Sequence, residues 1–214
     1  MSGIFITFEG IDGSGKSTQL RLLADALVER GLDVVRTREP GGTPLGARLR
    51  ALLLDAHEHV DPLAELLLFA ADRAQHVRTV LRPALDAGRV VLSDRYSDAT
   101  IAYQGAGRHF ALELIAQLIA VATEGLKPDL TLLFDVPIEL SLRRQLRRAL
   151  NEFGRGDRLD MEDAKFRTRV RERYLKLAAE DASRIRIIDA RGSIAETQAR
   201  VMETVKPLLE KQYG

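Results

Sequence analysis

The sequence predicts an α/β fold in which a mainly parallel five-stranded sheet is flanked by helices on both faces. Two observations indicate this fold. Apolar, β-prone runs alternate with stretches of helical character through all 214 residues, which is the pattern of repeated strand–helix–strand units. A glycine-rich segment also joins the first predicted strand directly to the first predicted helix. Because no repeat or low-complexity linker divides the chain, we expect residues 1–214 to form one domain.

The first strand, loop and helix carry the clearest motif. Residues 4–8 are apolar and β-prone, and residues 20–24 are typical of a helix. Between them, Gly10, Gly15, Lys16 and Ser17 match the phosphate-loop pattern G-x-x-x-x-G-K-[ST]. A chance match in a glycine turn is the alternative, but a strand before the loop and a helix after it are the context that the motif requires. We therefore predict a P-loop NTPase fold.

A phosphate loop binds the phosphates of a nucleoside triphosphate through its backbone N–H groups, at the positive end of the following helix. Lys16 is expected to reach the β- and γ-phosphates, and the Ser17 hydroxyl to bind Mg²⁺. The whole loop is then a candidate ATP site, formed by Gly10, Ile11, Asp12, Gly13, Ser14, Gly15, Lys16, Ser17 and Thr18.

The remaining elements follow in alternation. Further strands are predicted at residues 33–37, 89–94, 129–135 and 185–189. Helices are predicted at residues 44–56, 61–87, 112–125, 161–181 and 193–211, with another beginning at Pro137 and a short helical segment around Tyr103. Residues 151–157 contain two glycines and no apolar period, so we expect a mobile lid at about 147–160.

Composition excludes several classes of function. The chain has no cysteine, which excludes disulfides, thiolate catalysis and cysteine zinc sites. No apolar run approaches the ~18 residues of a membrane span, and the first strand begins too early to leave room for a signal peptide. A net charge of +1 argues against a nucleic-acid partner. A cytoplasmic enzyme is the expectation.

Charge is nevertheless uneven along the chain. Residues 143–173 hold ten arginines and one lysine against six acidic residues, a local excess of five positive charges. A solvated helical face with paired charges accounts for about half of these basic residues. Bound phosphates are the natural partner of the others.

Polar residues at the strand ends suggest what the triphosphate is used for, because ligands bind at the carboxyl edge of such a sheet. Asp94 ends an apolar strand, where it is expected to bind Mg²⁺, although a helix N-cap is the alternative role. Arg38 and Arg95 follow strand ends at this same edge of the sheet, and together they favour an acceptor that already carries a phosphate. The single asparagine, Asn151, does not begin an Asn-Lys-x-Asp motif, which argues against a GTPase.

Six segments resemble thymidylate kinases in order and spacing: 8–18 (FEGIDGSGKST), 38–43 (REPGGT), 68–73 (LFAADR), 94–96 (DRY), 102–105 (AYQG) and 127–131 (KPDLT). The resemblance extends over almost the whole chain. It implies a nucleoside monophosphate kinase-like fold and ATP-dependent phosphorylation of dTMP to dTDP, with Mg²⁺ as cofactor. Kinases for another monophosphate or a nucleoside, and a nucleotide-binding module without turnover, are the alternatives.

The resemblance also assigns roles to residues that the pattern alone leaves open. It implies that Phe69 stacks on thymine and that Arg73 binds a thymine carbonyl, whereas spacing alone is equally typical of a core residue and a surface charge. It places Arg38, Arg50 and Arg95 on the monophosphate, although Arg50 is equally consistent with a helix surface. Asp12 is implied near the sugar 3′-hydroxyl and the metal. The remaining implied pocket residues are Thr100, Tyr103 and Gln104.

Some family members carry an arginine inside the phosphate loop, but positions 11–14 here are Ile-Asp-Gly-Ser. The resemblance therefore implies that the lid supplies the catalytic cation. Arg158 is the first candidate, Arg144 and Arg148 are further ones, and Arg147 and Arg155 stay open. Around Arg191, the loop after the last strand is implied to cover adenine.

The resemblance further implies a homodimer through the apolar helical faces at residues 63–69 and 114–121, which are equally typical of a core.

Overall fold

The computed structural model describes residues 3–55, 59–152 and 162–213, except for the side chains at 148, 149, 151 and 152. Its centre is a five-stranded sheet in the order β2-β3-β1-β4-β5, and every neighbouring pair of strands is parallel. The strands are β1 (Ile4–Glu9), β2 (Val34–Arg38), β3 (Val90–Asp94), β4 (Leu130–Asp135) and β5 (Ile185–Asp189). The predicted fold class is confirmed.

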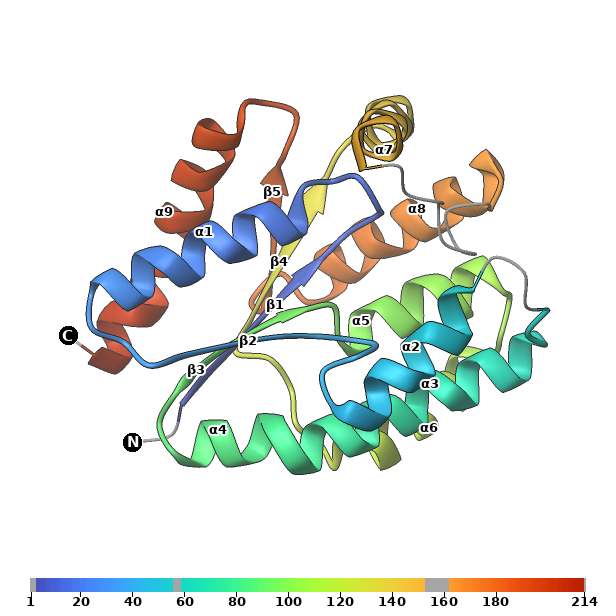
Figure 1. Cartoon of the computed structure of the whole chain (residues 1–214), viewed down its shortest axis with the longest axis horizontal. Coiled ribbons are helices and arrows are strands. Elements are labelled where there is room, and N and C mark those ends of the chain that lie inside the picture. Colours follow the sequence, from blue (N-terminus) through green and yellow to red (C-terminus); the bar gives the residue numbers. More distant parts are fainter. Residues whose placement is uncertain (1–2, 56–58, 153–161, 214) are drawn as a thin grey trace.

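Helices cover both faces of the sheet, as Figure 1 shows. On one face lie α1 (Lys16–Glu29) and α9 (Ile194–Tyr213), which pack on each other and on the alternate side chains Ile4, Ile6 and Phe8. On the other face, Phe5 packs against a turn of π-helix (Val77–Leu81) and α4 (Arg82–Asp86). Beside them on this face lies α8 (Ala164–Glu180), whose Tyr174 hydroxyl contacts the Glu9 carboxylate.

The remaining helices stand around the carboxyl edge of the sheet. They are α2 (Pro44–Leu54), α3 (Pro62–His76), α5 (Ser97–Thr100), a second π-helical turn (Ile101–Gly107), α6 (Leu112–Thr123) and α7 (Ile138–Glu152). The helix predicted at 61–87 forms as α3 and α4, joined by the π-helical turn before Pro83. Pro83 has no N–H to donate, so the regular hydrogen-bond ladder cannot run through this point.

Two other element boundaries differ from expectation for local reasons. The helix predicted from residue 161 begins at Ala164, because the Asp163 side chain accepts a hydrogen bond from the Phe166 N–H and caps it. The first part of the expected lid, residues 147–152, continues α7 as helix, and the rest lies outside the described residues. Within the described part of the chain, no helix has the length and apolar character needed to cross a membrane.

All five strands end in a charged residue at the same edge, namely Glu9, Arg38, Asp94, Asp135 and Asp189. The shared edge results from parallel pairing, since Arg38 and Phe8 both lie level with Asp94. This edge is where the candidate site forms.

Candidate functional site

The glycine loop between β1 and α1 has a conformation that only glycine allows at two points. Gly10 and Gly13 have positive φ angles of 133° and 76°. A Cβ at Gly10 would lie 2.4 Å from the Phe134 carbonyl oxygen, and one at Gly13 would lie 2.5 Å from that of Ser141. Gly15 precedes α1 and provides no side chain to cap it, so the first N–H groups of the helix face the loop. The loop therefore has the form of an anion-binding turn at a helix N-terminus.

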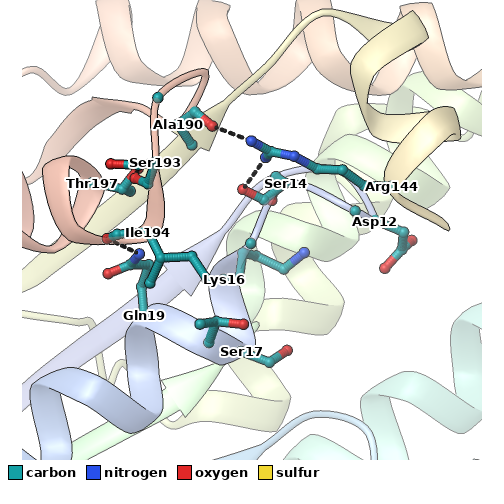
Figure 2. A pocket seen from close by; sticks show the side chains of 14 residues that line it. Asp12, Ser14, Lys16, Ser17, Gln19, Arg144, Ala190, Ser193, Ile194 and Thr197 are labelled. Atoms are coloured by element: carbon teal, nitrogen blue, oxygen red, sulfur yellow. Dashed lines mark hydrogen bonds between the residues drawn. The ribbon is translucent and has the colours of Figure 1, made fainter. Parts of the chain in front are cut away.

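A pocket of about 310 Å³ opens above this loop (Figure 2). Its walls come from the loop, from the first turn of α9 and from α7. The lining residues are Asp12, Gly13, Ser14, Gly15, Lys16, Ser17, Thr18, Gln19, Arg144, Ala190, Gly192, Ser193, Ile194 and Thr197. Eight of them lie between residues 12 and 19, so a single stretch of sequence makes most of this pocket. Because the sequence predicts that ATP, the phosphoryl donor, binds to this loop, we call this pocket the donor pocket.

Two cations belong to the donor pocket. The Lys16 ammonium is buried and donates to the Ile11 carbonyl at 3.0 Å. Burial and the neighbouring Arg95 lower the pKa of Lys16 from its ordinary value. The Arg144 guanidinium donates to the carbonyls of Ser14 at 3.4 Å and Ala190 at 2.9 Å, as Figure 2 shows. Arg144 thus ties α7 to the loop and to the start of the α9 segment.

A hydroxyl and a carboxylate suited to a hard cation lie at the edge of this pocket. The Ser17 hydroxyl donates to Asp94 Oδ2 at 2.6 Å. No group of three or more histidine, aspartate or glutamate side chains in the described part of the chain could hold a metal by itself. Mg²⁺ fits such a sparse set, because it keeps several waters and takes further oxygen ligands from substrate phosphates.

A second pocket, of about 70 Å³, lies on the other side of Asp12. Its lining comes from α2, α3, the segment after β2 and the segment after β3. The lining residues are Asp12, Glu39, Pro40, Arg50, Leu54, Phe69, Arg73, Arg95, Tyr96, Ala99, Thr100, Tyr103 and Gln104. The structure therefore brings together nearly all of the residues that the sequence assigns to an acceptor: Asp12, Arg50, Phe69, Arg73, Arg95, Thr100, Tyr103 and Gln104.

Arg95 lines the second pocket and pairs with Asp12, which lines both pockets. Its backbone has a φ of 73°, which is unusual for a residue with a side chain. Its guanidinium donates to the Gly10 carbonyl at 3.0 Å, to Asp12 Oδ1 at 2.7 Å and to the Tyr103 hydroxyl at 3.0 Å. Burial disfavours the Asp12 carboxylate, but Arg95 and Lys16 outweigh it and hold the pKa of Asp12 well below its usual range. Asp12 is therefore an anion between two cations.

Two buried residues that the sequence did not identify support Arg95. Glu9 Oε1 accepts from the Tyr96 N–H at 2.7 Å, and Glu9 Oε2 accepts from the Tyr174 hydroxyl at 2.7 Å. Tyr174 in turn accepts a longer bond of 3.4 Å from Arg95. Burial and the nearby Asp98 raise the pKa of Glu9 to about 8. An acidic residue ending a fully buried strand was a usable signal for Glu9, whereas nothing local marks Tyr174.

Arg73 occupies the far end of the second pocket and is almost completely buried. Its Nε donates to Glu39 at 2.8 Å, and its terminal nitrogens donate to the Thr100 hydroxyl at 2.9 Å and the Tyr96 carbonyl at 3.0 Å. Nearby, Gln104 donates to Glu65 at 2.8 Å, and Arg50 donates to the Pro40 carbonyl at 3.0 Å. Hydrogen bonds thus hold the polar side chains of this pocket in place.

Other predicted site residues lie elsewhere. Arg38 lines a separate open pocket of about 440 Å³, which it shares with Ser17 and Asp94. The Arg191 side chain is 68% exposed and pairs with Asp189 at 2.7 Å, and it does not line the donor pocket although its two neighbours do. Arg158 and Arg155 lie outside the described residues, as does the side chain of Arg148, while Arg147 is exposed on α7.

The comparisons with known proteins agree on one family. A family model described as thymidylate kinase matches residues 8–201. The chain is 49% identical over 205 residues to the thymidylate kinase of Geotalea uraniireducens, covering 95% of this chain and 96% of that one. It is 44% identical over 213 residues to the thymidylate kinase of Exiguobacterium sibiricum, covering 99% and 98%. A crystal structure of thymidylate kinase from Ehrlichia chaffeensis matches with a TM-score of 0.77 and 34% identity, covering 96% of this chain and 99% of that one.

Proposed function

This chain belongs to the thymidylate kinase family, and from this premise we propose that it transfers the γ-phosphoryl group of ATP to dTMP, forming dTDP and ADP. One observation carries the proposal: Asp12 lines both pockets, with Lys16 on the donor side and Arg95 on the acceptor side. A phosphoryl group that passes from one pocket to the other therefore passes close to these three charged side chains. The two pockets thus suit a donor and an acceptor whose reacting ends meet.

Catalysis in this arrangement is positioning and charge stabilisation. The acceptor is a phosphate, which is already an anionic nucleophile and needs little help from a base. Lys16 and Arg95 are held by the carbonyls of Ile11 and Gly10, so both cations are fixed near Asp12 before any substrate arrives. Preorganised charges of this kind stabilise the transferring group without reorganising during the reaction.

On the acceptor side, we assign Arg50 and Arg95 to the monophosphate, with Arg38 approaching it from the neighbouring pocket. The half-buried Phe69 presents an aromatic surface on which thymine stacks, and Arg73 binds a thymine carbonyl. Thr100, Tyr103 and Gln104 complete the base and sugar pocket. Discrimination against uracil rests on room for a methyl group, which is worth about 1–3 kcal/mol.

On the donor side, residues 10–18 hold the phosphates, and the segment that contains Arg191 borders the adenine. Ser17 and Asp94 hold Mg²⁺, with Asp12 nearby. When bound, Mg²⁺ neutralises charge on the β- and γ-phosphate oxygens.

The lid, at about 147–160, supplies a further cation in this proposal, from Arg158, Arg148 or Arg144. Arg144 already borders the donor pocket, whereas the other two side chains lie outside the described residues. An Arg158→Ala variant is expected to lower kcat by ~10³ or more, by analogy with arginine fingers. A loss below tenfold moves the role to Arg144, Arg147, Arg148 or Arg155.

We also propose a cytoplasmic homodimer. Leu63 and Leu67 on α3 are about half exposed, and Leu114 and Val121 on the adjacent α6 are 37% and 76% exposed. Such neighbouring apolar residues suit a contact between two copies of the chain. Sedimentation equilibrium at micromolar concentration tests this, and a monomer contradicts it.

An acceptor panel tests the function directly. ADP release with ATP and Mg²⁺ is measured with dTMP, dUMP, dCMP, AMP and thymidine. Turnover is expected with dTMP, and far weaker turnover with dUMP, dCMP or AMP. Equal turnover of AMP contradicts the assignment, preference for thymidine indicates a nucleoside kinase, and absence of turnover with every acceptor indicates a nucleotide-binding module.

A further inference from the structure

The roles assigned above leave Glu39 and His76, which are buried together with Arg73 at the acceptor pocket, without a function. The Glu39 carboxylate, just after β2, is held through both oxygens by two residues of α3. Arg73 Nε donates to Oε2 at 2.8 Å, and His76 Nδ1 lies 2.8 Å from Oε1. The side chains of Glu39, Arg73 and His76 are 3%, 3% and 0% exposed. Because Arg73 and His76 are three residues apart, the helix presents both to the same carboxylate.

His76 is itself fixed at its second nitrogen. A carboxylate only accepts hydrogen bonds, so Nδ1 carries the hydrogen and Nε2 pairs with the Thr37 hydroxyl at 2.6 Å. A Cβ at Gly42 would lie 2.5 Å from Nε2, so a glycine at this position makes room for the imidazole. His76 therefore bridges β2 to Glu39 in a space shaped for its ring.

The contacts of Arg73 show what the His76–Glu39 pair holds in position. A guanidinium has five N–H donors, and hydrogen bonds to Glu39, Thr100 and Tyr96 take three of them in the described part of the chain. The remaining two belong to the terminal nitrogens of a side chain that lines the acceptor pocket. The bond from Nε to Glu39 sets the plane of the guanidinium and hence the direction of these two donors.

We propose that His76 is a positioning residue for base recognition in the acceptor pocket. By holding Glu39 Oε1, it keeps Oε2 in line with Arg73 Nε, so that Arg73 directs its two remaining N–H groups at a carbonyl oxygen of a pyrimidine base. The proposal rests on the proposed function, because it takes the base of the acceptor to be the group that Arg73 binds.

Two substitutions of similar polarity separate the two ring nitrogens. In His76→Asn, the amide nitrogen can stand where Nδ1 stands and keep the bond to Glu39, while the bond to Thr37 is lost. In His76→Gln, the longer amide can reach the Thr37 hydroxyl instead. We expect His76→Gln to raise the KM for dTMP at least tenfold, with the KM for ATP within twofold of wild type. His76→Asn is expected to stay within threefold for both substrates.

A double-mutant cycle with Arg73→Ala distinguishes positioning from general stability. If His76 acts through Arg73, His76→Gln changes the KM for dTMP less than twofold when Arg73 is already alanine. Thr37→Val removes only the hydroxyl that pairs with His76, so it tests the same inference if His76→Gln does not fold. It is expected to raise the KM for dTMP about threefold with Arg73 present and to have no effect without it.

Three results overturn the inference. One is an unchanged KM for dTMP in both His76→Gln and Thr37→Val. Another is an equal rise in His76→Gln and His76→Asn, and the third is a rise that persists in the Arg73→Ala background. A wild-type enzyme that does not turn over dTMP overturns the proposed function and this inference together, so the acceptor panel is run first.

Discussion

The donor and acceptor pockets lie on either side of Asp12 but are built in different ways. The donor pocket comes mainly from one continuous stretch, and its glycines shape a backbone turn against a helix N-terminus. The acceptor pocket takes side chains from several separated segments, and buried ion pairs such as Arg73–Glu39 hold them in place. A backbone site depends on local conformation, whereas a side-chain site depends on the partners behind it.

The two kinds of site should therefore fail in different ways. In the donor pocket, one cation on a fixed turn can be removed without disturbing the acceptor pocket. In the acceptor pocket, removing one member of a buried network leaves its partner unsatisfied, and such a group costs about 1–3 kcal/mol. Substitutions there are expected to affect binding and folding together.

The largest expected effect is on the donor side. Lys16→Met keeps the length of the side chain and removes the charge that we propose to lie next to the transferring group. We expect kcat to fall by about 10²–10³-fold, the usual loss for one preorganised charge or donor, while dTMP binding, measured by calorimetry, changes less than about threefold. Arg30→Met, on an exposed residue at the end of α1, is the control and should keep full activity. A tenfold loss of dTMP affinity in Lys16→Met would show that the pockets are not separable.

A smaller effect is expected where the two pockets join. Tyr174→Phe removes the hydroxyl that donates to Glu9 and accepts from Arg95. We expect kcat/KM for dTMP to fall about tenfold and the free energy of unfolding to fall by about 1–3 kcal/mol, since Glu9 loses a buried donor. The matched control is Tyr96→Phe, because among the described residues the Tyr96 hydroxyl hydrogen-bonds only to the Leu126 carbonyl, at 3.3 Å. Equal activity losses in both variants would contradict a specific role for Tyr174.

The smallest effect on catalysis is expected from Asp72, which faces the segment after β2 and accepts from the Gly41 N–H at 3.2 Å. Burial and the nearby Glu39 raise the pKa of Asp72 from 3.8 to about 6. Between these values the folded state binds more protons than the unfolded state, so this group contributes stability at low pH that is lost as pH rises toward 6. A shift of two pKa units corresponds to about 3 kcal/mol.

The measurement is urea unfolding of wild type and Asp72→Asn from pH 4 to 7.5. Asp72→Asn lacks the titrating group. The free energy of unfolding of the variant minus that of wild type should therefore increase as pH rises from 4 to 6 and stay constant above pH 6. Asp86→Asn, at an exposed position ending α4, is the control. Parallel curves for wild type and Asp72→Asn would refute the raised pKa.

The strands and the donor loop could be predicted from the sequence pattern, whereas the residues of the acceptor pocket were harder to predict. Each of the five strands was predicted to within one residue at either end, because a parallel sheet buried on both faces leaves near-continuous apolar runs in the sequence. The donor loop was predicted from spacing alone, since its chemistry lies in consecutive residues. Phe69 and Arg73 were assigned only through the family resemblance, because a half-buried phenylalanine and an arginine on a helix have many other uses.

The buried partners were missed for a physical reason. His76 contacts Glu39, which is 37 residues away in the sequence, and Tyr174 contacts Glu9, which is 165 residues away. The two members of each pair come together only when the chain folds. No local pattern records such pairs. The positive φ of Arg95 was equally hidden, since the bonds that stabilise it come from the glycine loop and the π-helical turn after α5.

Asp12, as a wall common to both pockets, has a consequence for inhibition. Whatever factor a bound acceptor applies to the affinity of the donor, the donor must apply to the affinity of the acceptor. A compound that fills one pocket therefore has no single potency. Its apparent inhibition constant depends on the concentration of the substrate in the other pocket, so a compound ranked strong in a dilute assay can rank differently at cellular nucleotide levels.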